Sequence, residues 1–168
     1  MGERLTKSDI EKIEKEIEER KLVKRPELIE EVKEARAQGD LSENFEYYAA
    51  KREKNLNESR IRYLERMLKF ATIVEEKASA DDEAALNKTV TVYFPDDDET
   101  ETFRIVTSIR GNSLKGLISI DSPMGKALLH RRVGDTVYVK VNEHAGYNVV
   151  IKEIGEVLDD TDDAIRQY

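Results

Sequence analysis

Two carboxylates three residues apart, Asp40 and Glu43, are the residues of this chain whose types and spacing most directly suggest chemistry. Mg²⁺ prefers oxygen ligands, keeps several waters and takes one or two carboxylates from a typical protein site. Two acids are too few to make a tight site alone. They could complete a metal site whose other ligands come from a second protein, and Ser42 between them could orient a water molecule.

The same spacing also has a structural explanation. In a capping box, the side chain at the N-cap accepts a backbone hydrogen bond, and a Glu three residues later folds back to the cap amide. The helix dipole further favours acids at the start of a helix. Asp40 or Ser42 could therefore cap the following helix. Spacing alone leaves both interpretations open, and they are not mutually exclusive.

The acidic turn, near residues 39 to 44, separates two segments with helical periodicity. Apolar residues recur at spacings of three and four over residues 5 to 37 and again over residues 43 to 74. Pro26 cannot donate a helical hydrogen bond, so we expect a break or kink near residues 23 to 26. Gly39 suits the left-handed conformation that ends a helix. The short turn predicts an antiparallel hairpin, which must project because roughly thirty helical residues rise about 45 Å.

The second half of the chain changes to the alternating pattern of β-strands. Residues 77 to 87 are the expected linker between a hairpin domain, residues 1 to 76, and a second domain, residues 88 to 168. The expected strands are 89–94, 102–106, 117–120, 136–141 and 147–154. A short helix is expected over 122–129, with Pro123 at its first position. This order predicts an α+β protein with a twisted, mostly antiparallel sheet and one packed helix.

Charge and composition limit the possible functions. The chain is 38% charged, carries a net charge of −8 and contains no Cys. The missing Cys residues exclude disulfides, and the acidity argues against a non-specific nucleic-acid binder, which needs Lys and Arg. No signal peptide or membrane-length apolar run is present, so we expect a cytoplasmic protein without a membrane partner. The acidic runs at 96–101 and 159–163 are expected to be a solvated turn and a frayed tail.

Three separated motifs resemble the bacterial GreA/GreB transcript-cleavage factors. They are the segments 25–29, 34–51 and 118–129, the last followed by Val133-Gly-Asp135. The resemblance spans almost the whole chain. It implies a coiled coil that enters the secondary channel of bacterial RNA polymerase and an FKBP-like C-terminal domain that docks at the channel rim. It also implies a monomer, not itself an enzyme, that stimulates the polymerase to cleave backtracked RNA.

The resemblance assigns roles to particular residues. Asp40 and Glu43 would help hold the second, weakly bound Mg²⁺ of the polymerase, and the chain would hold no cofactor alone. Contact with the nascent RNA 3′ end is expected from Arg36, Lys51, Arg52 and Tyr47. Tyr48 falls on the expected helical seam, which makes Tyr47 the better exposed candidate for stacking on a base. The candidate docking residues are Asp121, Ser122, Pro123 and Met124. A DNA-binding role is also among the implied functions.

Some features depart from the family pattern and keep rival functions open. Phe45 and Tyr48 make the tip bulkier than expected, and the acidic extension after Leu158 is unfamiliar. The leading rival is a protein that occupies the polymerase channel and inhibits it. A second is a peptidyl-prolyl isomerase or chaperone module, which would need an aromatic-lined pocket. A direct nuclease would need more metal ligands than the tip supplies.

Overall fold

The structure is a computed structural model that describes residues 2–39, 44–160 and 163–167. The chain divides into two compact units. The first, called here the hairpin unit, comprises Met1–Glu3 and Lys7–Thr72, and the second, the sheet unit, comprises Arg4–Thr6 and Ile73–Tyr168. None of the described helices is long and apolar enough to cross a membrane.

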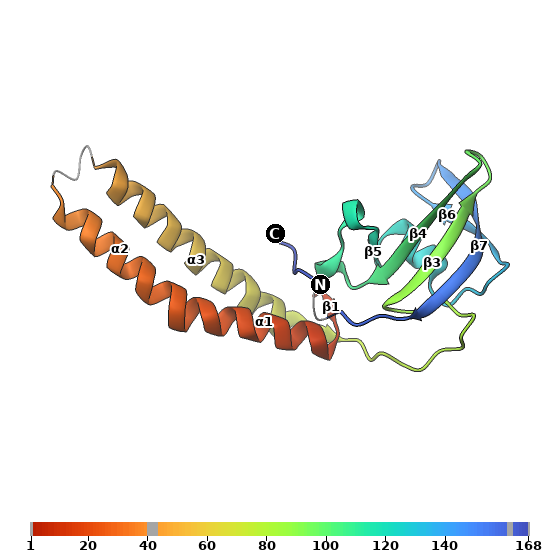
Figure 1. The fold of residues 1–168 in the computed structure, drawn as a ribbon, viewed down its shortest axis with the longest axis horizontal. Coiled ribbons are helices and arrows are strands. Elements are labelled where there is room, and N and C mark those ends of the chain that lie inside the picture. The colour runs from red at the N-terminus through yellow and green to blue at the C-terminus, as the bar shows by residue number, and fades with distance from the viewer. Residues whose placement is uncertain (1, 40–43, 161–162, 168) are drawn as a thin grey trace. The chain divides into compact units, whose positions relative to one another are not determined.

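The hairpin unit contains two antiparallel helical arms. One arm consists of α1 (Lys7–Glu19), a five-residue π-helical turn (Arg20–Lys24) and α2 (Arg25–Ala37). The other arm is a single helix, α3 (Phe45–Phe70). Figure 1 shows α3 running alongside α1 and α2 over its whole length. The predicted helical hairpin is confirmed, although α3 is shorter at both ends than the pattern suggested.

The π-helical turn replaces the break that Pro26 led us to expect. Pro26 lies in the first turn of α2, where its missing N–H is tolerated. The backbone N–H of Arg25 donates to the Arg20 carbonyl, which widens the turn without breaking the helix. The side chain of Asn57 on α3 also donates to this carbonyl, at 3.2 Å, and Arg20 donates back to the Asn57 amide oxygen at 3.0 Å. The opposite arm thus stabilises the widened turn.

The seam between the arms is partly polar. Ile13, Ile61 and Leu64 are buried there, and so is Arg60, which is 3% exposed. Arg60 Nε lies 2.8 Å from Glu16 Oε2, and the same oxygen accepts from Arg20 Nε at 2.8 Å. Burial raises the pKa of Glu16, but the hydrogen bonds from Arg60 and Arg20 outweigh it and hold that pKa below its usual value.

The buried face of α3 agrees with the predicted one only in the second half of the helix. The predicted pattern runs through Phe45, Tyr48, Ala49, Arg52, Leu56, Ile61, Leu64 and Leu68. Ile61 and Leu64 are buried as expected, but the members from Phe45 to Leu56 are exposed, Phe45 by 85% and Leu56 by 52%. The seam instead runs through Asn57 and the buried apolar residues beyond it. The error arose because Asn57 and Arg60 are polar and therefore do not count in an apolar periodicity.

The sheet unit is built on a five-stranded mixed sheet of order β5-β4-β3-β7-β6. Its elements are β3 (Lys88–Phe94), β4 (Glu99–Val106), β5 (Leu117–Ser119), α4 (Pro123–Leu128), β6 (Thr136–Lys140) and β7 (Gly146–Val157). Only β4 and β5 are parallel. A separate two-stranded pair joins β1 (Arg4–Leu5) to β2 (Thr72–Ile73). The predicted mostly antiparallel sheet with one short helix is confirmed.

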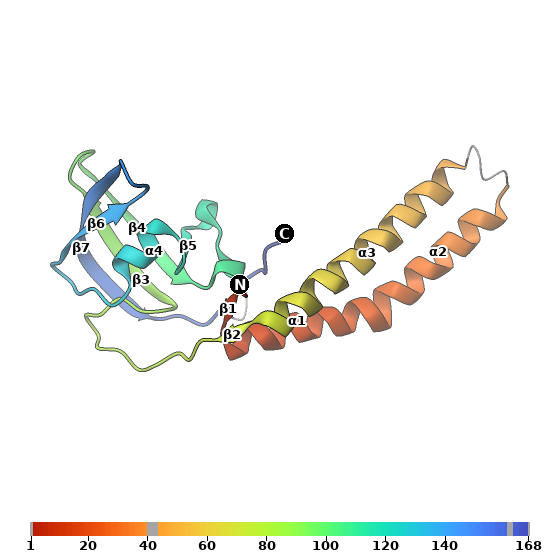
Figure 2. The same ribbon diagram turned by 180° about the vertical axis from the view of Figure 1, so that it is seen from behind.

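The core of this unit forms where α4 packs on one face of the sheet, which Figure 2 shows from behind. Alternate side chains of the strands point into it, as the period of two requires. Its fully buried members are Ala84, Val90, Val92, Ile105, Leu128, Val139, Val149 and Ile151. Two short 3₁₀ turns, Ser108–Arg110 and Ser113–Lys115, connect β4 to β5.

The two acidic runs behave differently from each other. Asp96, Asp97 and Asp98 form an exposed turn between β3 and β4, as predicted. The tail was expected to be frayed, and this is wrong for its described residues. Asp160 is 7% exposed, and the backbone N–H of Arg166 donates to the Ile109 carbonyl at 2.7 Å. The tail folds back because buried cations of the sheet unit pair with its carboxylates.

Candidate functional site

The predicted metal-binding residues Asp40 and Glu43 lie outside the described residues, on the connection between α2 and α3, and so does Ser42, the residue predicted to orient a water. In the part of the chain that is described, no group of three or more His, Cys, Asp or Glu side chains could hold a metal ion. The donor set of the connection is two carboxylates, which suits Mg²⁺ completed by ligands from elsewhere. The metal role of this pair stays a prediction.

Asn44 caps α3 and ties the two arms together where this connection ends. Its side-chain oxygen accepts from the backbone N–H of Tyr47 at 3.0 Å, and its amide nitrogen donates to the Ala35 carbonyl near the end of α2 at 2.5 Å. The prediction that Asp40 or Ser42 caps this helix is wrong. Asn caps as well as Asp or Ser, and it alone also has N–H groups to donate. The predicted capping box of Asp40 and Glu43 lies outside the described residues.

Three of the predicted RNA-contacting residues lie together beside this cap. The Tyr47 hydroxyl accepts from Arg36 Nη2 at 3.3 Å, and the Arg36 guanidinium lies 5.4 Å from the centre of the Tyr47 ring. Lys51 Nζ lies 6.0 Å from the same ring. The hydrogen bond from Arg36 lowers the pKa of the Tyr47 hydroxyl, and the charge of Lys51 adds to this effect. We call Arg36, Tyr47 and Lys51 the tip cluster.

The exposures of the two tyrosines are the reverse of those expected. Tyr48 is 49% exposed, whereas Tyr47 is half-buried beneath its cationic neighbours. The two rings meet edge to face, with centres 5.4 Å apart. Arg52 lines a shallow groove of about 380 Å³ together with Lys51 of the tip cluster, Tyr48 and Leu56. Tyr48 is thus the more accessible ring for stacking.

The predicted docking residues lie at the start of α4. The Ser122 hydroxyl caps this helix by accepting from the Gly125 N–H at 3.0 Å, and it donates to the Ser119 carbonyl at 2.6 Å. Pro123 is exposed at the first helical position, whereas Met124 is 9% exposed and belongs to the core. Surface contact is therefore available to Asp121, Ser122 and Pro123, while Met124 supports them from below.

Asp121 is held in place by residues that the sequence analysis did not identify. One carboxylate oxygen accepts from the Ser108 hydroxyl at 2.6 Å, and the other pairs with Arg4. Ser119 accepts from the Asp121 backbone N–H at 2.9 Å. Burial raises the pKa of Asp121, but the hydrogen bonds from Ser108 and Arg4 outweigh it and lower that pKa overall. Ser108 and Arg4 are distant in sequence, so no local pattern could have identified them.

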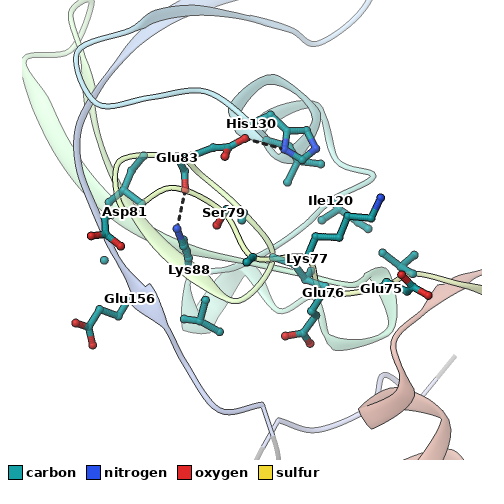
Figure 3. A pocket seen from close by; sticks show the side chains of 18 of the residues that line it. Glu75, Glu76, Lys77, Ser79, Asp81, Glu83, Lys88, Ile120, His130 and Glu156 are labelled. Carbon is teal, nitrogen blue, oxygen red and sulfur yellow. Dashed lines mark hydrogen bonds and ion pairs between the residues drawn. The ribbon is translucent and has the colours of Figure 1, made fainter.

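The sheet unit also contains a cavity of about 1060 Å³ beside the segment that follows β2 (Figure 3). The ammonium group of Lys88 reaches two carbonyl groups of the surrounding loop, Ala80 at 2.7 Å and Glu83 at 3.0 Å. His130 Nδ1 lies 3.4 Å from a Glu83 carboxylate oxygen. No Phe, Tyr or Trp is among the described residues that line it. This lining gives no support to the isomerase alternative, which needs aromatic walls.

Comparison with known proteins places both halves of the chain in one family. The family described as transcription elongation factor, N-terminal, matches residues 3–73, and the one described as transcription elongation factor, GreA/GreB, C-term, matches residues 79–156.

Two relatives from Streptococcus agree with this assignment by sequence. Transcription elongation factor GreA of Streptococcus pneumoniae is 46% identical over 136 residues, which cover 81% of this chain and 85% of the relative. GreA of Streptococcus sanguinis is 46% identical over 154 residues, which cover 92% and 96%. Among solved structures, GreA factor homolog 1 of Thermus thermophilus is 28% identical, with a TM-score of 0.43 and coverage of 93% and 100%. The chain therefore belongs to the GreA/GreB family of transcription elongation factors.

Proposed function

We propose that this protein binds bacterial RNA polymerase, inserts its hairpin into the secondary channel and stimulates the polymerase to cleave backtracked RNA. The observation that carries the proposal is the match of both halves of the chain to the GreA/GreB family. The relatives that are 46% identical are named transcription elongation factors. Arrested complexes would resume synthesis once the extruded RNA has been removed.

The length and stiffness of the hairpin support this proposal. Its longer helix, α3, has 26 residues and therefore rises about 39 Å. The partly buried ion pair of Glu16 and Arg60 stiffens the seam between the arms, and Asn44 joins them at the far end. A stiff two-helix arm of this length can carry two carboxylates into the interior of a much larger enzyme.

Asp40 and Glu43 are the residues that would hold the second Mg²⁺ of the polymerase. When bound, this ion supplies Lewis-acid stabilisation of the charge that develops during phosphodiester hydrolysis. The tip cluster binds the extruded RNA, because Arg36 and Lys51 are cations beside an aromatic ring and can contact phosphates. Tyr48, as the more exposed ring, stacks on a base. This protein supplies no nuclease site of its own.

Docking places the sheet unit against the polymerase through Asp121, Ser122 and Pro123. Asp121 is ionised at neutral pH, and its two oxygens are oriented by Ser108 and Arg4. A fixed carboxylate beside an exposed Pro123 offers a partner both a charge-assisted hydrogen bond and an apolar contact. Polymerase docking is therefore assigned to the sheet unit, and stimulation of RNA cleavage to the hairpin unit.

The test is cleavage of 3′-labelled RNA in a stalled, backtracked polymerase complex with Mg²⁺. The parent should release labelled fragments, and the Asp40→Asn/Glu43→Gln variant should be slower by about a hundredfold or more. Asp96→Asn/Asp97→Asn, in the exposed turn between β3 and β4, is the matched control, since it removes the same charge far along the chain.

Binding is measured beside cleavage, by competition for the polymerase. A parent that binds without stimulating cleavage would refute the proposal and favour the channel-occupying inhibitor. A parent that accelerates proline isomerisation in a peptide assay, and does not bind polymerase, would favour the isomerase instead.

A further inference from the structure

The C-terminal tail, residues 158–167, is an ordered part of the sheet unit at its described positions and lies beyond the family match, which ends at residue 156. The tail starts where the backbone N–H of Leu158 donates to the Asn87 carbonyl at 2.9 Å. Near its end, Ile165 is 7% exposed and Arg166 is bonded to Ile109. The described residues at both ends of the tail are thus bonded to the sheet unit.

Arg110 is the centre of these contacts. Its side chain is 1% exposed, and its Nη1 donates to the Asp160 carbonyl. Nη2 lies 3.8 Å from an Asp160 carboxylate oxygen, and Nη1 lies 3.7 Å from Asp163 Oδ2. A buried guanidinium is costly unless it is paired and hydrogen-bonded. The tail supplies both carboxylates that these ion pairs use.

Two further side chains of the sheet unit hold the same carboxylates. Arg104 on β4 pairs with Asp163 Oδ2, and the side chains of both residues are only 12% exposed. Asn87 Nδ2 donates to Asp160 Oδ2 at 3.2 Å. Asp160 and Asp163 are therefore held from separate segments of the unit. This arrangement explains an acidic run that charge alone would assign to a solvated tail.

The tail binds the same turn, Ser108–Arg110, that orients the docking carboxylate of Asp121. Arg110 and Ile109 belong to the 3₁₀ turn Ser108–Arg110, which closes by a backbone bond from Arg110 to the Thr107 carbonyl at 3.0 Å. Ser108, in the same turn, donates to Asp121 and shares a 2.7 Å hydroxyl contact with Ser119. The tail and the docking carboxylate Asp121 therefore contact the same three-residue turn.

We infer that the tail is a positioning element for the docking site: Asp160 and Asp163 hold Arg110, and the turn Ser108–Arg110 holds the Asp121 carboxylate in the orientation that a partner binds. The identity of that partner, RNA polymerase, rests on the proposed function. Asp160 and Asp163 act through Arg110 and do not touch the partner themselves. Removing them lowers affinity and leaves the catalytic tip unaffected.

The experiment compares the full chain with Asp160→Asn/Asp163→Asn and with a chain ending at Leu158. Asp96→Asn/Asp97→Asn again matches the change in charge. In the free protein, amide hydrogen exchange over residues 107–122 should become faster in the two tail variants only. In backtracked complexes, the factor concentration that gives half-maximal cleavage should rise about tenfold, as expected from losing one charge-assisted contact. The maximal rate at saturation should not change.

Each result has a distinct meaning. Unchanged exchange and unchanged half-maximal concentration in both tail variants would overturn the inference. A raised half-maximal concentration with unchanged exchange would also overturn it, since the tail would then contact the polymerase directly. A truncated chain that fails to fold would also lose maximal cleavage rate. In that case the double substitution Asp160→Asn/Asp163→Asn, which keeps the size of both side chains, decides the inference. If the full chain does not bind polymerase, the proposed function fails, while the exchange result still decides whether the tail holds the turn.

Discussion

Asn44 makes two hydrogen bonds that can be separated by substitution. Its oxygen caps α3, and its amide nitrogen bonds the Ala35 carbonyl on the opposite arm. Replacing an Asn cap by Ala costs about 1 kcal/mol, and a typical intramolecular hydrogen bond contributes a further amount of about 1 kcal/mol. We expect Asn44→Ala to destabilise the end of the hairpin by about 2 kcal/mol. Asn44→Asp retains the cap acceptor but has no N–H to donate, so it should lose about half of this.

The measurement is native-state hydrogen exchange at the Tyr47 and Tyr48 amides, which reports the local opening of the first turn of α3. The amide of Tyr47 donates to the Asn44 side chain, and that of Tyr48 donates to its carbonyl at 3.2 Å. About 2 kcal/mol corresponds to roughly thirtyfold faster exchange, and about 1 kcal/mol to roughly fivefold. Equal effects of Asn44→Asp and Asn44→Ala would refute the separate bond to Ala35. No effect of either variant would refute the cap.

The remaining predictions concern charge. The pKa of Glu16 is lowered in the folded protein, so its contribution to stability is complete above its unfolded pKa of about 4.3 and disappears as the pH falls through the folded value. Urea unfolding at several pH values should show this loss of unfolding free energy. In Glu16→Gln the unfolding free energy should depend less on pH. Arg36→Gln should raise the pKa of the Tyr47 hydroxyl, because the hydrogen bond from Arg36 is lost. Ultraviolet titration of tyrosinate measures the shift, and Tyr47→Phe identifies the signal. An unchanged titration curve would contradict the contact between Arg36 and Tyr47. Asp121→Asn should raise the half-maximal factor concentration about tenfold at an unchanged maximal rate; a reduced maximal rate instead would contradict a docking role.

Sequence periodicity predicted the hairpin and the sheet, but it predicted the buried face of α3 only for the second half of the helix. Its apolar residues Tyr48 and Leu56 face outward, and the seam contains Asn57 and Arg60 instead. These polar residues are buried because Glu16 and Arg20 on the other arm satisfy them. A pattern of apolar spacing contains no information about such partners, since they lie some forty positions away.

The candidate site was predictable to the same extent. The docking segment was predicted from its motif and stays a prediction, whereas Arg36, Lys51 and Tyr47 do meet at one end of the hairpin. The sequence did not reveal Asn44 as the cap, because Asp40 and Ser42 are equally good cap residues nearby. It also could not distinguish a solvated acidic tail from a paired one. That distinction depends on Arg110, fifty residues from Asp160, being buried beneath it.

The π-helical turn sets the rotational phase of the hairpin tip. Such a turn holds one residue more than the regular helix, and one residue of an α-helix corresponds to a rotation of about 100°. If the same residues, Arg20–Lys24, were wound as regular α-helix, the whole of α2 would turn by that angle relative to α3. Arg36 would then face away from the ring of Tyr47, and Ala35 away from Asn44. A local insertion midway along one arm thus determines which side chains meet at its far end.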